Sequence, residues 1–206
     1  MILACNTASA KALRTIQQKD LPQIEGLRRV LGVIRPTVEK IGAATATRHV
    51  GVLGTPGTIL SNSYTLEIQK LFPDITVTGE ACPLWVPLVE SGAHNSQGAD
   101  FFIQKHIQAI LEKDPQIDAL ILGCTHYPLL EEKIRHYVPP AVSILSQGEY
   151  VAESLADYLH RHPEIETLCS KGHTARFFTT ETGDRFSDRA SLFLQQPVCA
   201  SRIVLE

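Results

Sequence analysis

Two cysteines with polar residues directly after them are the residues of this sequence best suited to chemistry. Cys5 opens the string Cys-Asn-Thr, and Cys124 opens the string Cys-Thr-His. Each follows a short apolar run and precedes a stretch with helical periodicity, so we expect both thiols at the N-terminal end of a helix. The positive end of a helix dipole and its unpaired N–H groups stabilise a thiolate. Each loop is therefore suited to an acid, a base or a nucleophile.

The polar neighbours of the thiols have structural explanations as well as chemical ones. Asn6, Thr7 and Thr125 are natural helix N-cap residues, and capping explains them as well as substrate contact does. His126 lies two residues after Cys124. This spacing fits an activated nucleophile, an acid/base pair, a metal ligand or an ordinary loop residue, and it does not rank them.

Two further segments carry polar groups. The turn at residues 54–58, Gly-Thr-Pro-Gly-Thr, offers the hydroxyls of Thr55 and Thr58 ahead of a helix, which suits a carboxylate or a phosphate. The local pattern alone favours a plain turn with an N-cap at Thr58, and the turn lacks the lysine of a P-loop. Glu90 follows the apolar run 82–89 and is either a partly buried carboxylate or a solvated helix end.

The elements that must position these residues alternate between short apolar strands and longer helical stretches. This alternation predicts an α/β fold with a mostly parallel sheet flanked by helices. Open α/β sheets bind ligands at the carboxyl ends of their strands, where both cysteine loops are expected. Strands are predicted at 2–4, 30–34, 49–53, 75–78, 118–122 and 142–145, near 177 and at 203. Helices are predicted at 7–18, in a segment that begins at 36, in a later segment that ends at 71, and at 98–113, 129–137, 148–161 and 185–194.

The equivalent setting of the two cysteine loops suggests two lobes with the active site at their interface. Residues 30–146 are predicted to form a central α/β lobe, and residues 1–29 with 147–206 a first lobe. Met1 lies in or next to a strand, and the Cys5 loop follows at once, whereas strands usually run about five to six residues. We therefore expect the first lobe to be truncated, with upstream sequence missing.

The composition argues against several classes of protein. A net charge of -3 gives no basic footprint for nucleic acid, and the apolar runs are too short to cross a membrane. No secretory signal pattern opens the sequence. Five cysteines, an odd number without a Cys-x-x-Cys motif, argue against a disulfide framework or a zinc ribbon. We expect a cytoplasmic protein without nucleic-acid or membrane partners.

The segments around both cysteines resemble the signature loops of glutamate racemases. They are residues 4–10, Ala-Cys-Asn-Thr-Ala-Ser-Ala, and residues 122–129, Leu-Gly-Cys-Thr-His-Tyr-Pro-Leu. Residues 54–58, 81–90 and 177–180 resemble further segments of the family in the same order. A broader amino-acid racemase family shares the paired cysteines but typically not the Gly-Cys-Thr-His-Tyr-Pro string. The resemblance implies a two-lobe α/β enzyme that interconverts L- and D-glutamate without cofactor or metal and supplies D-glutamate for peptidoglycan synthesis.

The resemblance also implies a role for each candidate residue. Cys5 and Cys124 would act on opposite faces of the α-carbon, where one thiolate removes the α-proton and the other thiol delivers a proton. His126 would assist Cys124, and Glu90 would be a carboxylate near the Cys5 side. The carboxylates and ammonium of the substrate would be held by Asn6, Thr7, Thr55, Thr58 and Thr125.

Departures from the family pattern keep alternatives open. The family has an Asp-Ser-Gly loop near its start and a Pro-Tyr-Gly loop further on, and neither string occurs in this sequence. One alternative is a truncated, catalytically silent relative that binds a partner or ligand. Others are a racemase for aspartate or another amino acid, and a metal-dependent hydrolase that uses Cys124 and His126. The expected partner is glutamate as a small-molecule substrate, and a homodimer is compatible with the sequence.

Overall fold

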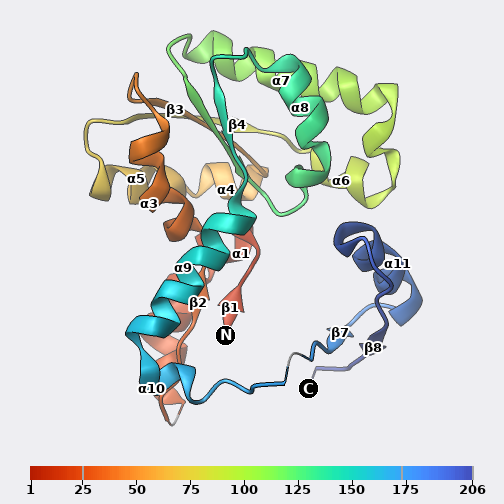
Figure 1. Cartoon of the computed structure of the whole chain (residues 1–206). Helices are drawn as coiled ribbons and strands as arrows, with labels where there is room; N and C mark the ends of the chain where they lie inside the picture. The colour runs from red at the N-terminus through yellow and green to blue at the C-terminus, as the bar shows by residue number, and fades with distance from the viewer. Residues whose placement is uncertain (25, 173, 206) are drawn as a thin grey trace. The chain divides into compact units, whose positions relative to one another are not determined.

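The computed structural model describes residues 1–24, 26–172 and 174–205 (Figure 1). The chain forms two compact units, Met1–Ile165 and Glu166–Glu206. Every predicted site residue lies in the first unit. In both units the strands pair in parallel and are flanked by helices, which confirms the predicted α/β fold. The predicted division into lobes at 1–29 with 147–206 and at 30–146 stays a prediction.

A four-stranded parallel sheet is the centre of the first unit. Its strand order is β4 (Thr76–Ala81), β3 (His49–Gly54), β5 (Ala119–Gly123) and β6 (Ser143–Leu145). The inner strands β3 and β5 are almost entirely buried, as expected for near-continuous apolar strands covered on both faces. Their carboxyl ends lie next to each other because Gly54 pairs with Gly123. The loops after β3 and β5 are therefore neighbours.

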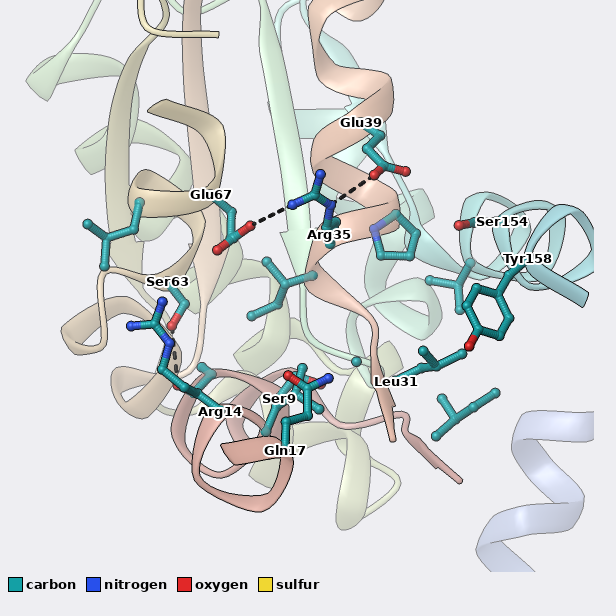
Figure 2. Close-up of a pocket in the computed structure, with 18 of the residues that line it drawn as sticks. Ser9, Arg14, Gln17, Leu31, Arg35, Glu39, Ser63, Glu67, Ser154 and Tyr158 are labelled. Atoms are coloured by element: carbon teal, nitrogen blue, oxygen red, sulfur yellow. Dashed lines mark hydrogen bonds and ion pairs between the residues drawn. The ribbon is translucent and has the colours of Figure 1, made fainter. Parts of the chain in front are cut away.

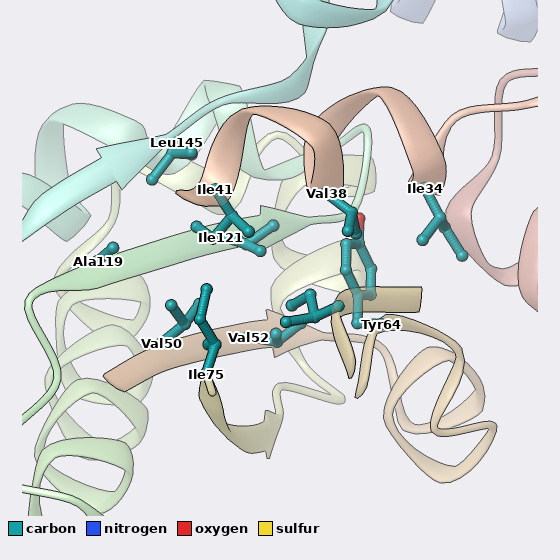
Figure 3. Packing of buried hydrophobic residues seen from close by; sticks show 11 residues of the cluster. Ile34, Val38, Ile41, Val50, Val52, Tyr64, Ile75, Ala119, Ile121 and Leu145 are labelled. Atoms are coloured by element: carbon teal, nitrogen blue, oxygen red, sulfur yellow. The ribbon is translucent and has the colours of Figure 1, made fainter. Parts of the chain in front are cut away.

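Helices cover the two faces of this sheet. On one face, α3 (Ile34–Ala44) and α5 (Ser63–Leu71) pack on alternate residues of β3 and β5, as Figure 3 shows. On the other face lies α7 (Gln97–Lys113), close enough that a Cβ on Gly51 would meet the Ile110 side chain at 2.9 Å. Fully burying each large aliphatic side chain contributes about 1.5–3 kcal/mol. The core on the face covered by α3 and α5 is made of Ile34, Val38, Ile41, Val50, Val52, Tyr64, Ile68, Ile75, Ala119, Ile121 and Leu145.

The start of the chain forms a smaller parallel pair of β1 (Ile2–Leu3) and β2 (Leu31–Gly32). The single helix predicted at 7–18 is broken into three parts between these strands. The predicted strand at 30–34 is shorter, because its last residue already begins α3. The parts of the broken helix are α1 (Asn6–Lys11), α2 (Leu13–Thr15) and the π-helix η1 (Ile16–Asp20), and the 3-10 turn η2 (Leu21–Gln23) follows them.

The helix predicted to run through residue 71 is also divided. It becomes α4 (Pro56–Leu60) and α5, separated at Asn62, whose left-handed backbone (φ 54°) interrupts a right-handed helix. The remaining elements of the first unit are α6 (Trp85–Glu90), η3 (Ala93–Asn95), η4 (Tyr127–Leu130), α8 (Glu131–Tyr137), α9 (Gln147–Arg161) and α10 (Pro163–Glu166), the last of which reaches the boundary between the units.

The second unit is a small parallel pair with one helix between its strands. It contains β7 (Phe177–Thr179), α11 (Gly183–Leu194) and β8 (Ala200–Arg202). The predicted strand at 203 lies one residue past the end of β8. Among the described helices of either unit, none combines the length and the apolar character that a membrane crossing requires.

Candidate active site

The Cys5 loop lies at the start of α1. Cys5 is the N-cap residue of this helix with extended backbone (φ −89°, ψ 129°), and its side chain is exposed. Its carbonyl oxygen accepts a hydrogen bond of 2.9 Å from the Ser9 N–H. The following residue, Asn6, is 2% exposed and its side chain hydrogen-bonds Gln147 and Tyr64. The thiol is thus presented to solvent from a backbone whose next residue is anchored in the interior.

Three threonine hydroxyls predicted to bind substrate meet beside this loop. The Thr7 hydroxyl oxygen lies 2.8 Å from that of Thr55 and 3.1 Å from that of Thr58, and the latter two are 3.1 Å apart. Thr55, not Thr58 as the pattern predicted, is the N-cap of α4, and its oxygen accepts from the Thr58 N–H at 3.3 Å. The cluster joins α1 to the loop after β3. A Cβ on Gly57 would lie 3.0 Å from the Thr7 methyl, so glycine permits this close approach.

The Cys124 loop follows β5, and its thiol is buried, with the residue 7% exposed. Burial raises the pKa of the Cys124 thiol from 9.0 to about 11. Hydrogen bonds from the backbone N–H groups of His126 and Thr125 to the sulfur lower the pKa, and the nearby charge of Cys5 raises it. At neutral pH Cys124 is therefore a thiol, held in a place where its thiolate has two backbone donors. Thr125 itself is exposed and does not cap a helix.

Behind Cys124 stands a histidine–carboxylate pair. His126 Nδ1 lies 3.9 Å from Cys124 Sγ, and His126 Nε2 lies 2.6 Å from Glu90 Oε1. Glu90 ends α6, which packs on η4 through the buried rings of Trp85 and Tyr127, whose centroids are 4.8 Å apart. This packing holds Glu90 beside His126. The position near the Cys5 side that the resemblance implied is therefore corrected to the Cys124 side.

The two cysteine loops face a common region. The Cys5 thiol is close enough to Cys124 for its charge to raise the pKa of the buried thiol. Tyr64 lies between the loops, with its hydroxyl donating to Asn6 at 2.7 Å and its ring against Gly123, where a Cβ would be 3.3 Å from Cε2. Two thiols from separate loops, one backed by a histidine and a carboxylate, can serve as a pair of acid/base groups.

Comparisons with known proteins agree with this geometry. The model of the Asp/Glu/Hydantoin racemase family matches residues 1–155. The chain belongs to this family. Glutamate racemases of Ruegeria sp. (strain TM1040) and Paracoccus denitrificans are 38% and 36% identical to it, each over 96% of this chain and 74% of their own length.

Solved structures of racemases have the same fold. A glutamate racemase of Bacillus anthracis matches 99% of this chain and 73% of its own with a TM-score of 0.86 and 30% identity. The glutamate racemase of Francisella tularensis in complex with D-glutamate matches 100% of this chain and 72% of its own, with a TM-score of 0.82 and 30% identity. The chain therefore shares the α/β fold of glutamate racemases.

A cavity of this racemase-family chain lies elsewhere in the first unit. Its volume is about 850 Å³, and none of the predicted site residues is among the described residues that line it. Figure 2 shows Arg35 within it, paired with Glu39 at 3.0 Å and with Glu67 at 3.6 Å. We therefore place the candidate site at the cysteine loops, where the acid/base groups are, and not at this cavity.

The remaining three cysteines are expected from the sequence to take no part in the chemistry. Cys82 is fully buried near Cys124, and burial raises the pKa of its thiol. Its sulfur donates to the Glu80 carbonyl at 3.7 Å, which is typical of a core thiol. Cys169 and Cys199 lie in the second unit. Across the described residues, no group of three His, Cys, Asp or Glu side chains could hold a metal ion.

Proposed function

We propose that this chain interconverts L- and D-glutamate without a cofactor, using Cys5 and Cys124 as the two acid/base groups. The observation that carries the proposal is the pair of thiols on adjacent loops, the buried one backed by His126 and Glu90. Its glutamate racemase relatives support glutamate as the substrate. We propose further that the product D-glutamate supplies peptidoglycan synthesis and that the reaction takes place in the cytoplasm.

The chemistry requires one thiolate and one thiol at a time. The thiolate takes the α-proton from one face of glutamate, and the electron pair of the broken C–H bond is delocalised into the α-carboxylate. The thiol on the opposite face then gives its proton to the α-carbon and becomes the thiolate. Each turnover therefore inverts the α-carbon and exchanges the protonation states of Cys5 and Cys124.

His126 and Glu90 help Cys124 to change its protonation state. The Glu90 carboxylate accepts a hydrogen bond from His126 Nε2–H, and this fixes the tautomer whose Nδ1 is an acceptor. That nitrogen faces the Cys124 sulfur at 3.9 Å and can hold the S–H proton. Such help matters because a thiol with a pKa of about 11 is a poor source of thiolate at neutral pH.

The hydroxyl cluster supplies polar groups for the substrate. Thr7 and Thr55 are partly exposed, whereas Thr58 is 1% exposed and supports the other two. We propose that Thr7 and Thr55 bind a carboxylate of glutamate and that Thr125 binds from the Cys124 side. Asn6 is proposed to contribute from the Cys5 loop, although its amide already bonds Gln147 and Tyr64.

The test is to incubate the purified chain with L-glutamate and to measure the circular dichroism signal of the amino acid over time. We expect the signal to decay with the wild type. With Cys5→Ser or Cys124→Ser we expect the signal to stay constant. Cys199→Ser is the control and should keep the wild-type rate, because Cys199 lies outside the unit that holds the site. A wild type that leaves the signal unchanged would favour a silent binding protein. Faster decay with L-aspartate would favour an aspartate racemase.

A further inference from the structure

Three buried side chains close a ring of hydrogen bonds directly behind Cys5. Asn6 Nδ2 donates to Gln147 Oε1 at 2.6 Å, and Gln147 Nε2 donates to the Tyr64 hydroxyl at 2.6 Å. The Tyr64 hydroxyl in turn donates to Asn6 Oδ1 at 2.7 Å. Each group donates to the next, and the three residues are 2%, 8% and 3% exposed. Such buried, fully bonded networks are rigid, because an unmade bond would leave a polar group without compensation for its lost water.

The ring joins helices that are distant in the sequence. Asn6 is the first residue of α1, Tyr64 lies in α5, and Gln147 is the first residue of α9. Gln147 Nε2 also lies 2.8 Å from the Thr37 hydroxyl of α3. The start of α1, and with it the adjacent Cys5, is thereby fixed to three other helices of the first unit.

Tyr64 reaches the second cysteine loop as well. Its ring packs on Gly123, the residue before Cys124, where an added Cβ would lie 3.3 Å from Cε2. Burial raises the pKa of Tyr64, so its hydroxyl stays protonated and keeps donating to Asn6. One side chain thus bonds the residue after Cys5 and contacts the residue before Cys124.

We infer that Tyr64 and Gln147 are positioning residues that set the separation of the two catalytic thiols. Tyr64 is the spacer between the loops, and Gln147 anchors it and Asn6 in one orientation. The inference rests on the proposed racemisation, in which both thiols must reach one α-carbon from opposite sides. A misplacement of about 1 Å at a reacting group costs about a hundredfold in rate.

The first test compares Tyr64→Phe and Gln147→Met with Tyr150→Phe. Tyr64→Phe keeps the ring against Gly123 but removes the hydroxyl bonds, and we expect kcat to fall by about tenfold to a hundredfold. Gln147→Met keeps the length of the side chain, loses all its hydrogen bonds and should behave in the same way. Tyr150 packs on the same core from α9, so Tyr150→Phe should keep the wild-type rate.

A second measurement separates positioning from a loss of folded protein. Enantiomers have equal free energy, so kcat/KM is the same in both directions for every variant and cannot show which thiol is displaced. Primary isotope effects with α-deuterated L- and D-glutamate can show it. We expect Tyr64→Phe to raise the effect for the enantiomer from which Cys5 removes the deuteron and to leave the other near wild type. A smaller folded fraction would change neither effect.

A third measurement does not depend on activity. Iodoacetamide labelling followed by mass spectrometry gives the rate at Cys5 relative to Cys199, an exposed thiol of the second unit. We expect this ratio to change severalfold in Tyr64→Phe and Gln147→Met, and to stay constant in Tyr150→Phe. Unchanged labelling ratios and isotope effects in folded variants would overturn the inference. If the wild type does not racemise glutamate but the labelling ratio changes in the variants, the proposed function is overturned and the positioning of Cys5 by Tyr64 and Gln147 is not.

Discussion

At the scale of single residues, the two cysteines of the site have different surroundings. Cys5 is exposed at a helix start, whereas Cys124 is buried after the central strand β5. Burial raises the pKa of Cys124 more than its two backbone donors lower it. The resting site therefore holds Cys124 as a thiol, ready to donate a proton before it accepts one.

This difference predicts how Cys124 reacts with alkylating agents as the pH changes. With a pKa of about 11, the thiolate fraction of Cys124 should rise about tenfold for each pH unit from 7 to 10. Labelling of Cys124 by iodoacetamide, followed by mass spectrometry, should rise in proportion and level off only above pH 11. Denatured chain, in which the thiol has its ordinary pKa, should level off about two units earlier. Labelling that is already maximal at pH 8 would contradict this assignment.

Glu90 gives a second prediction at this scale. Glu90→Gln replaces an acceptor with an amide that can donate to His126 Nε2, which favours the other tautomer and removes the acceptor facing Cys124. We expect kcat for glutamate to fall by about a hundredfold, the typical size of a general acid/base contribution. Glu149→Gln, an exposed carboxylate on α9, is the matched control and should be unchanged. Equal rates for both variants would exclude a role for Glu90.

At the scale of elements, the site depends on how closely α1 and α4 approach each other. The contact places Thr7 against Gly57 and brings three hydroxyls within 3.1 Å of one another. Gly57→Ala would gain helix propensity but push the Thr7 methyl away from a Cβ only 3.0 Å distant. We expect KM for glutamate to rise by about threefold to tenfold, since a shift of a few tenths of an ångström costs less than a full ångström.

The control for this variant is another glycine in the first turn of a helix. Gly98→Ala in α7 meets no atom closer than 3.6 Å, so its KM should match the wild type. Thermal unfolding of both variants shows whether each is folded at the assay temperature. An unchanged KM in a folded Gly57→Ala chain would show that the hydroxyl cluster does not bind substrate.

The elements also show what could be predicted from the sequence. The strands β3 and β5 were predicted to within a residue because continuous apolar runs between turns have a simple pattern. The helix breaks at residues 12 and 62 were not predicted, because they depend on local backbone geometry within otherwise helical stretches. The ring behind Cys5 could not be predicted either, since Tyr64 and Gln147 lie 83 residues apart and neither has a sequence signal for burial. The cysteine and threonine loops were singled out by their resemblance to the loops of glutamate racemases, because each is a short contiguous string, and their role in the site stays a prediction.

At the scale of the whole molecule, the chain divides into compact units at residues 165 and 166. The sequence predicts a different grouping, in which residues 147–206 join residues 1–29 as one lobe. The predicted grouping puts the Cys5 and Cys124 loops in different lobes, whereas both loops lie in the compact unit Met1–Ile165. The segment that follows the boundary is largely exposed, including Lys171 and Arg176.

This exposure predicts the order of cleavage by trypsin. Lys171 and Arg176 should be cut before the lysines of α7, because a protease needs an exposed, extended segment and α7 is a long helix packed on the central sheet. Mass spectrometry of a time course should show a fragment ending at one of these residues that persists while others disappear. Gel filtration after that cut then tests the grouping itself. The predicted lobe requires the two fragments to elute together, and separate elution would show that Glu166–Glu206 forms no lobe with residues 1–29.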